Sequence, residues 1–324
     1  MLLAVVLFLA GFALLIKGGD WFVDGATGIA HRFHLPEILI GATVVSIGTT
    51  LPEVMVSAQA ALQHNSGISY GNAIGSIICN TALIAAITIA VRPSLVDRKS
   101  LKLPVTGFFI AAVIYCLIVY LSGRFERWHG FMFLAMFAVY MIVSVMQMKE
   151  SGSEEQPSEA AEPENQETTL VKDLVLLVAG AAMIAVGARL LVDNGTLIAE
   201  ALGVPSSVIG LTMVALGTSL PELITAITSL RKGISSLSLG NIIGANLFNI
   251  VLVSGTAIAI SPFAVPTEKT LFGINSSLIV DIPVMMGVMS LLCFPALAKG
   301  RLSRWQGIVL LCIYAAFIIY QFAI

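Results

Sequence analysis

The sequence predicts an all-α polytopic membrane protein in which ten transmembrane helices form two inverted five-helix repeats. Three observations predict this fold class: an apolar composition, a series of long apolar runs, and two copies of one motif pattern at a fixed offset. Of the 324 residues, 57% are hydrophobic and 11% are charged, whereas soluble domains carry about 25% charged residues. This composition excludes an ordinary soluble enzyme and a disordered chain. The net charge of −2, without a basic cluster, excludes a nucleic-acid binder.

Apolar runs long enough to cross a bilayer follow one another along the chain, since a spanning helix needs about 20 apolar residues. The first run has no positively charged start and no small-residue cleavage site, so we interpret it as a retained span and not as a signal peptide. The predicted spans are 2–30, 36–62, 70–91, 103–121, 128–148, 171–200, 205–230, 236–260, 278–298 and 305–323.

An acidic segment between the fifth and sixth spans has a different composition. It holds seven glutamates, two prolines and no aromatic residue between Glu150 and Thr169, which is typical of a disordered linker. Its glutamates lack the spacing of a calcium-binding loop, so we interpret the segment as a solvated connector. The predicted domains are a first five-helix repeat at 1–148, an acidic cytoplasmic linker at 149–169 and a second five-helix repeat at 170–324.

Two motifs recur at an offset of 169 positions. GATVVSIGTTLPE at 41–53 aligns with GLTMVALGTSLPE at 210–222, and GNAIGSIICN at 71–80 aligns with GNIIGANLFN at 240–249 without a gap. A repeat with an odd number of spans enters the membrane in the opposite direction each time, so the two repeats are predicted to be inverted. Inverted repeats place substrate sites near the bilayer midplane.

The charge of the loops predicts how the chain is oriented in the membrane. If the N-terminus lies outside, the inner loops and span ends carry twelve lysines and arginines, and the outer ones carry three. Positive residues gather on the cytoplasmic side. We therefore expect an N-terminus outside and a linker in the cytoplasm.

Each copy of the first motif places a proline and a glutamate deep inside an apolar span. Pro52 and Pro221 remove a backbone donor and free a carbonyl one turn earlier, so each helix is predicted to kink or unwind at its GTT or GTS triplet. Glu53 and Glu222 follow these prolines directly. A central acidic residue costs about 2.5–3.5 kcal/mol on insertion scales and is a functional candidate by default. No lysine or arginine repeats with the two glutamates, so a structural salt bridge has little support.

Helical spacing extends the glutamates into polar faces on two spans of each repeat. In the first repeat, the faces consist of Ser46, Thr49, Thr50, Glu53 and Ser57, followed by Asn72, Ser76 and Asn80. In the second repeat, they consist of Ala215, Thr218, Ser219, Glu222 and Ala226, followed by Asn241, Ala245 and Asn249. Every polar member carries oxygen, and no histidine or cysteine lies in register. Such hard ligands suit calcium, sodium, magnesium or manganese and argue against zinc or copper.

GTTLPE and GTSLPE, each followed by a GN-x-I-G-x-x-x-x-N motif, resemble the two alpha-repeats of the cation/calcium exchanger superfamily, in particular those of prokaryotic sodium/calcium exchangers. The resemblance extends over essentially the whole chain. It implies an antiporter, not an enzyme, that exchanges sodium for calcium by alternating access and extrudes calcium. It also implies a prokaryotic plasma (inner) membrane, calcium and sodium as the transported ions, no cofactor and no obligatory protein partner.

The resemblance further implies four central ion sites, one for calcium and the others for sodium. The implied calcium ligands are the side chains of Glu53 and Glu222 and the carbonyls of Thr49 and Thr218. The implied sodium ligands are Thr50, Ser219, Ser76, Asn80 and Asn249, with the carbonyls of Ser46 and Ala215. In the family, the first and sixth spans slide against the remaining bundle, and here both are rich in small residues that permit close contact.

Two positions depart from the family pattern. Many prokaryotic members carry aspartate where this chain has Asn249, and serine is common where it has Ala245. Two carboxylates neutralise one divalent ion, so three sodium ions would leave one positive charge and make a three-for-one cycle electrogenic. Ala245 lacks the hydroxyl of an outer sodium site. The number of sodium ions per cycle, and whether sodium is the counter-ion, therefore stay open. The alternative function is a proton antiporter for calcium or another divalent cation.

Other features have plainer interpretations. Asp281, two residues before Pro283, is predicted to be a helix N-cap. Asp24 and Asp193 are repeat-related and either line an ion entrance or cap a helix. The four cysteines lie in apolar runs without a CxxC pair, so neither a zinc site nor a disulfide framework is predicted. A cation channel, with acidic rings around a symmetric pore, and an intramembrane hydrolase are less favoured.

Overall fold

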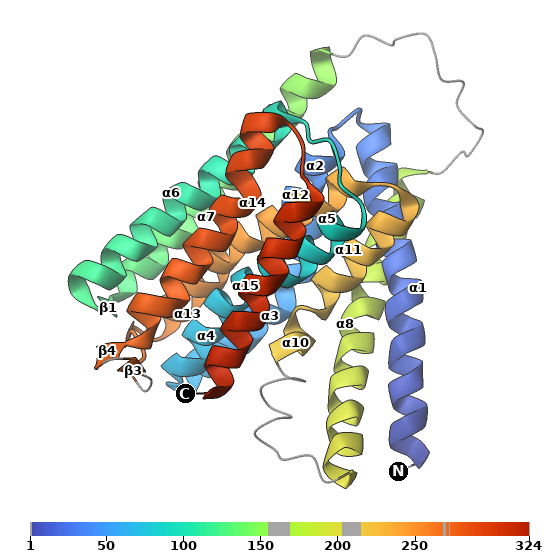
Figure 1. The fold of residues 1–324 in the computed structure, drawn as a ribbon. Helices are drawn as coiled ribbons and strands as arrows, with labels where there is room; N and C mark the ends of the chain where they lie inside the picture. The colour runs from blue at the N-terminus through green and yellow to red at the C-terminus, as the bar shows by residue number, and fades with distance from the viewer. Residues whose placement is uncertain (1, 155–168, 203–214, 268–269, 272, 324) are drawn as a thin grey trace.

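The computed structural model describes residues 2–154, 169–202, 215–267, 270–271 and 273–323 and shows a bundle of long helices (Figure 1). Within these residues, nine helical segments are long and apolar enough to cross a membrane. The all-helical membrane fold predicted from the sequence is therefore confirmed.

The first repeat follows the predicted spans, and short π-helical segments, labelled η, interrupt two of them. Its helices are α1 (Leu2–Arg32), α2 (Glu37–Ile40), η1 (Gly41–Val45), α3 (Ser46–Leu62), α4 (Ser66–Cys79), η2 (Asn80–Ala85), α5 (Ala86–Val91), α6 (Arg98–Ser122) and α7 (Arg127–Glu154). The elements α2, η1 and α3 form one span, and α4, η2 and α5 form the next. Helix α7 continues past residue 148 into the segment predicted as linker.

The second repeat has the same order of elements where it is described. Its helices are α8 (Leu170–Ala201), α10 (Ala215–Thr218), α11 (Leu220–Lys232), α12 (Ser235–Phe248), η4 (Asn249–Ser254), α13 (Gly255–Ile260), η5 (Ser277–Asp281), α14 (Ile282–Lys299) and α15 (Arg304–Ala323). The first part of the predicted span 205–230 lies outside the described residues, and α10 and α11 form the rest of it. The segments η2 and η4 begin at Asn80 and Asn249, which are repeat-related positions.

Short strands, which the sequence did not predict, pair in the loops at one end of the bundle (Figure 1). Strand β1 (Arg124–Phe125) pairs antiparallel with β2 (Phe263–Ala264), and β3 (Thr270–Leu271) pairs antiparallel with β4 (Ile274–Asn275). A single bridge between Leu95 and Arg301 joins the loop before α6 to the loop before α15. The β1–β2 pairing and the Leu95–Arg301 bridge tie loops of the first repeat to loops of the second, whereas β3 and β4 both belong to the second repeat.

Helices α1 and α8 run antiparallel and lie side by side (Figure 1). A Cβ atom added at Gly11 would lie 2.8 Å from the carbonyl oxygen of Gly187, and one added at Gly180 would lie 2.8 Å from that of Gly18. Only glycine permits backbones to approach this closely. Because α1 and α8 are the first helices of their repeats and point in opposite directions, the predicted inversion of the repeats is confirmed.

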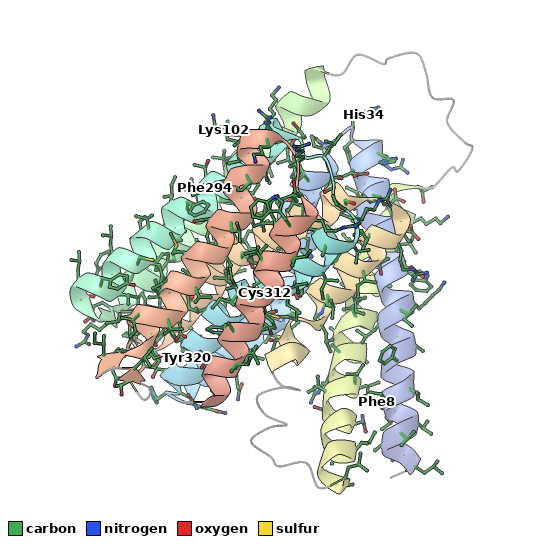
Figure 2. The ribbon with its side chains drawn as sticks, in the orientation of Figure 1. Phe8, His34, Lys102, Phe294, Cys312 and Tyr320 are labelled. Carbon is green, nitrogen blue, oxygen red and sulfur yellow. The ribbon has the colours of Figure 1, made fainter. Side chains whose placement is uncertain are left out.

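An ion pair joins the same two helices at the end that carries His34 (Figure 2). The Nη2 atom of Arg32 lies 3.2 Å from Oδ2 of Asp173, whose side chain is only 2% exposed. A Cβ atom at Gly28 would collide with the same carboxylate, at 2.6 Å from its Oδ1 atom. Glycine packing and a shielded ion pair therefore hold α1 and α8 together as one unit.

Helix α12 packs parallel to the span formed by α2, η1 and α3. A Cβ atom at Gly240 would lie 2.2 Å from the carbonyl oxygen of Ile38, and one at Gly244 would lie 2.6 Å from the Cα atom of Ala42. These contacts place the second motif of one repeat directly against the first motif of the other. The centre of the molecule is therefore built from both repeats.

The outer surface of the bundle carries large apolar side chains. Leu9 is 60% exposed, and Phe294 is 54% exposed on α14, where Figure 2 shows it on the outside of the bundle. In a bilayer such side chains contact lipid, and the polar groups are kept inside the protein. The chain is an integral membrane protein with many spans.

Asp281 is not the helix N-cap that the sequence predicts. The helical turns begin four residues earlier, at Ser277 in η5, and the Asp281 side chain makes no capping hydrogen bond. Its Oδ1 atom instead accepts a hydrogen bond of 3.0 Å from Nε2 of Gln321 in α15.

Asp24 and Asp193 lie inside α1 and α8, so neither caps a helix. Asp24 Oδ1 lies 2.6 Å from the Nζ atom of Lys232, at the end of α11. Asp193 Oδ2 lies 3.5 Å from Nε of Arg189, one turn earlier in the same helix. That these residues line an ion entrance stays a prediction.

Candidate ion-binding site

Three repeat-related pairs of buried polar side chains stand out at the centre of the bundle. Each member is at most 2% exposed, and its side-chain polar atoms make no hydrogen bond to any described residue. The pairs are Thr50 with Ser219, Glu53 with Glu222, and Asn80 with Asn249. Buried polar groups are normally hydrogen-bonded, because an unpaired one costs about 1–3 kcal/mol. Matching unpaired groups in both repeats are therefore candidates for ion ligands.

Helix α3 places the predicted polar face of the first repeat towards the interior. Ser46, Thr49, Thr50, Glu53 and Ser57 are all buried at 1% exposure or less. The face was predicted from three-to-four-residue spacing, and its burial is confirmed. Of the predicted kink or unwinding at the GTT triplet, the unwinding is wrong, because α3 is continuous from Ser46 to Leu62 with Pro52 inside it. A kink at this triplet stays a prediction.

The second repeat does break at its corresponding triplet. Helix α10 ends at Thr218, and α11 begins at Leu220. Ser219 between them has φ −90° and ψ 4°, and Pro221 stands in the first turn of α11, where its missing N–H removes no helical bond. The break places Glu222 in the first turn of α11, where the helix dipole favours a negative charge.

The two asparagines begin π-helical segments. Asn80 opens η2 and Asn249 opens η4. A π-helical turn includes one additional residue and is frequent at functional sites. In η4, the Ser254 hydroxyl donates to the Asn249 carbonyl at 3.0 Å. A side chain therefore provides a hydrogen bond to a backbone carbonyl of this segment. Hydrophobic periodicity gave no signal for these segments.

Neighbouring polar residues are hydrogen-bonded and hold the site in place. Asn241 Oδ1 accepts from the Thr49 hydroxyl at 3.1 Å and from the Ser46 hydroxyl at 3.3 Å. The single hydrogen of the Ser46 hydroxyl is shared between Asn241 and the carbonyl of Gly41, which lies closer at 2.8 Å. The hydroxyls of Ser46 and Thr49 therefore tie the two repeats together, and the carbonyls of these residues are the ligands that the family resemblance implies.

The remaining predicted residues have different positions. Ser76 is buried in α4, one turn before Asn80. Thr218 is partly exposed at the end of α10, and for Ala215 the structure describes only the backbone, at the start of the same helix. Ala245 is fully buried in α12, where it offers no polar side-chain atom.

Two glycines of the motifs contact the α1 and α8 unit. A Cβ atom at Gly48 would lie 3.1 Å from the Phe22 ring of α1. A Cβ atom at the repeat-related Gly217 would collide with the Val192 side chain of α8. The unit of α1 and α8 therefore touches the GTT and GTS triplets of both repeats.

The charge and chemistry of the site favour hard cations. The carboxylates of Glu53 and Glu222 repel each other, and among the described residues no lysine or arginine pairs with either. The buried side chains of Thr50, Ser219, Asn80 and Asn249 add neutral hydroxyl and amide groups that have no hydrogen bonds to described residues. Among the described residues, no group of three His, Cys, Asp or Glu side chains could hold a metal ion. Two carboxylates with neutral oxygen ligands suit calcium and sodium better than zinc or copper.

Sequence reasoning missed three more buried hydroxyls in the second repeat. Thr225 and Ser229 follow Glu222 on α11, and Ser238 lies on α12. Their side-chain oxygens make no hydrogen bond to any described residue. For Thr225 and Ser229, the signal in the sequence is a hydroxyl three and seven residues after Glu222, which the repeat alignment does not show because Val56 and Ala60 stand at the matching positions.

An inverted-repeat membrane protein with paired carboxylates buried at the centre is a cation transporter, and not an enzyme. The comparison with known families agrees with this class. The chain belongs to the sodium/calcium exchanger protein family, whose sequence model matches residues 3–146 and 172–323.

Relatives match over nearly the whole chain. An uncharacterized membrane protein of Methanocaldococcus jannaschii is 36% identical over 97% of this chain and 96% of its own length. The sodium/calcium exchanger MaX1 of Methanosarcina acetivorans is 32% identical over 98% of both chains. A solved structure of the sodium-calcium exchanger NCX_Mj, soaked with 10 mM Na+ and 10 mM Sr2+, superimposes with a TM-score of 0.83 at 33% identity and 98% coverage of both chains.

Proposed function

We propose that the protein is a secondary active antiporter that exchanges sodium for calcium by alternating access and extrudes calcium from the cytoplasm. One observation carries the proposal: the central polar atoms without hydrogen bonds to described residues form three repeat-related pairs of oxygen-bearing side chains. An ion bound between the repeats would restore these missing interactions. Relatives of this chain named as sodium/calcium exchangers support the choice of ions.

In this proposal, calcium binds between Glu53 and Glu222 with the carbonyls of Thr49 and Thr218. Two carboxylates neutralise its charge, and neutral oxygens complete the six to eight ligands that calcium takes. The sodium ions use Thr50, Ser219, Ser76, Asn80 and Asn249, with the carbonyls of Ser46 and Ala215.

Sodium and calcium compete for the same two carboxylates, and this competition couples their movements. Either the calcium-loaded or the sodium-loaded form exists, so each crossing carries one kind of ion. With three sodium ions per calcium ion, one positive charge moves per cycle. We propose that the orientation follows the loop charge, with the N-terminus outside and the acidic linker in the cytoplasm of a prokaryotic plasma membrane.

Uptake of radioactive calcium into sodium-loaded proteoliposomes diluted into potassium tests the proposal. We expect uptake that requires internal sodium and disappears in Glu53→Gln and Glu222→Gln. Glu126→Gln is the matched control, because it makes the same substitution at a carboxylate that lies 2.7 Å from Arg124 in the loop before α7, away from the centre. Uptake that persists in both Glu53→Gln and Glu222→Gln would contradict the assigned site.

A proton-coupled antiporter is the second candidate, and the residues at two positions favour it. Asn249 adds no charge to the centre, and Ala245 adds no hydroxyl, so the sodium sites are poorer than in the family pattern. An imposed pH gradient replaces the sodium gradient in the same proteoliposomes. Calcium uptake driven by the pH gradient and not by sodium would assign the proton as counter-ion.

A further inference from the structure

We infer that the second repeat holds a cation access route from the central glutamates to the cytoplasmic end of the molecule, along the hydroxyls of Thr225, Ser229 and Ser238. The inference rests on the proposed function, because a transported cation must leave the centre on this side. None of these three residues belongs to the predicted ion ligands. The route consists of buried hydroxyls without hydrogen bonds to described residues and of two cavities.

The hydroxyls of Thr225 and Ser229 continue the central site along one face of α11. They follow Glu222 by three and seven residues, which places all three side chains on the same side of the helix. Thr225 and Ser229 are fully buried. Helix α1 covers a different face of α11, since a Cβ atom at Gly19 would lie 2.7 Å from Ile224 and 2.8 Å from Thr228. The hydroxyl face therefore points into the bundle.

Ser238 continues the row on the neighbouring helix. A tight turn after α11, in which the Ile234 amide donates to the Ser229 carbonyl at 2.8 Å, brings the start of α12 back beside Ser229. Ser238 is 4% exposed. In a membrane interior, hydroxyls without protein partners are costly. Water or a passing cation, both of which these oxygens can bind, offsets that cost.

The row ends at a small cavity. This cavity, of about 10 Å³, has room for about one water molecule. Ser238 and Ser235 of α12, Thr88 of α5 and Ser94 of the following loop supply polar walls. Arg92 also lines it and is exposed to solvent at its rim.

A larger cavity of about 190 Å³ adjoins the first and shares Ser94, Ser235 and Leu239 with it. Its lining adds the carboxylates of Glu37 and Asp97. Cations concentrate where acidic groups line a low-dielectric cleft. Serine walls, an acidic outer chamber and a hydroxyl row therefore follow one another from the cytoplasmic end to Glu222.

Cysteine labelling tests the route. In a background with Cys79, Cys116, Cys293 and Cys312 replaced by alanine, Thr225→Cys, Ser229→Cys and Ser238→Cys are exposed to a membrane-impermeant cationic methanethiosulfonate reagent. The reagent is applied to inside-out and to right-side-out vesicles. Val56→Cys and Ala60→Cys, at the repeat-related positions, and Ile227→Cys, which is 39% exposed on the outer surface of α11, are the matched controls.

We expect labelling of the three route positions from the cytoplasmic face, faster than that of the controls and slowed by calcium. No labelling from that face, with intact sodium/calcium exchange in the parent protein, would overturn the route and leave the proposed function standing. Labelling from the outer face alone would also overturn it. Calcium-sensitive labelling in a protein without any calcium transport would support the route and overturn the proposed function.

A second pair of variants covers the case in which a cysteine disturbs folding. Thr225→Val and Ser229→Ala install the residues that the first repeat carries at these positions. We expect the double variant to slow calcium movement through the cytoplasmic side about tenfold, the factor that corresponds to roughly one lost hydroxyl contact. Calcium binding from the outer side should not change. An unchanged rate would contradict a role of the two hydroxyls in ion passage.

Discussion

The α3–α4 hairpin of the first repeat and the α11–α12 hairpin of the second carry the same motifs but bond differently. In the first, Asn72 Nδ2 donates to the Glu53 carbonyl at 3.1 Å and to the Ser57 hydroxyl at 2.9 Å, so the hairpin bonds to itself. In the second, Asn241 bonds across to Ser46 and Thr49 of the first repeat. The asparagine of the same motif therefore bonds within its own hairpin in the first repeat and to the other repeat in the second.

The difference has a cause in the sequence. The first repeat carries Ser46 and Ser57, and the second carries Ala215 and Ala226 at the matching positions. If the two repeats exchanged conformations, as inverted-repeat transporters do, Asn241 would turn towards Ala226 and Asn72 towards Ala215. The contacts that Ser57 and Ser46 make would be lost, whereas Thr218, at the position that matches Thr49, keeps a hydroxyl. Repeat symmetry in sequence therefore does not imply equal energy for the two arrangements.

Removing either central carboxylate should give the largest effect and should affect both hairpins alike. We expect Glu53→Gln and Glu222→Gln each to reduce calcium transport by about two orders of magnitude or more, because one remaining carboxylate leaves a divalent ion half neutralised. Transport assays in proteoliposomes measure this. A loss in only one variant would break the functional equivalence of the two repeats.

A double-mutant cycle can separate the two asparagines. We expect Asn241→Ala and Asn72→Ala each to lower the free energy of unfolding by about 1–3 kcal/mol, since each removes two side-chain hydrogen bonds. Combined with Thr49→Val, Asn241→Ala should be non-additive and Asn72→Ala additive. Thermal unfolding in detergent gives the values. Additive free energies in both cycles would contradict a stabilising hydrogen bond between Thr49 and Asn241.

Making the repeats alike should reduce the preference for one arrangement. We expect Ser46→Ala with Ser57→Ala to shift the balance between the two arrangements by about 1–3 kcal/mol, which is roughly 5- to 150-fold. The ratio of apparent calcium affinities on the two membrane faces reports the shift. Ser69→Ala is the control, because its hydroxyl bonds to the Ser57 carbonyl and has a serine, Ser238, at the matching position. It should change the ratio less.

The smallest effect concerns a helix cap that only the first repeat has. Asp97 caps α6 through the amides of Lys99 and Ser100, and Pro266 stands at the matching position. We expect Asp97→Ala to cost about 1 kcal/mol of stability and Asp97→Asn to cost less, since asparagine also caps.

The contribution of this cap should depend on pH. Burial opposes the charge of Asp97, but hydrogen bonds from the Ser100 side chain and the two amides outweigh it and lower the pKa of the carboxyl. A lowered pKa in the folded state means that the stabilisation is present at neutral pH and is lost as the pH falls through that pKa. The difference between wild type and Asp97→Ala should therefore shrink in acid. A difference that grows in acid would contradict the capping role.

Much of the fold and the centre of the site could be predicted from the sequence. The offset of 169 positions predicted inverted repeats, and helical spacing from Glu53 predicted the buried face of α3. Proline alone did not determine backbone breaks: Pro221 accompanies a break at Ser219, whereas Pro52 lies inside an unbroken helix. That outcome depends on packing around each span.

Long-range bonds were beyond sequence reasoning. Thr49 and Asn241 lie 192 positions apart, and Asp281 bonds to Gln321 in another helix and caps nothing. Local patterns report spacing within one helix, and such partners depend on how helices meet. The hydroxyl of Thr225 could not be predicted from the repeats, because the first repeat has Val56 at the matching position.

The glycine packing of α1 against α8 has a mechanical consequence. Two helices whose backbones touch cannot slide past each other without separating. We therefore expect α1 and α8 to move together as one rigid body. The Phe22 ring of α1 lies against Gly48, and the Val192 side chain of α8 lies against Gly217. A single displacement therefore reaches both halves of the ion site at once. The two repeats can therefore move together without any other contact between them, because the α1–α8 pair touches both.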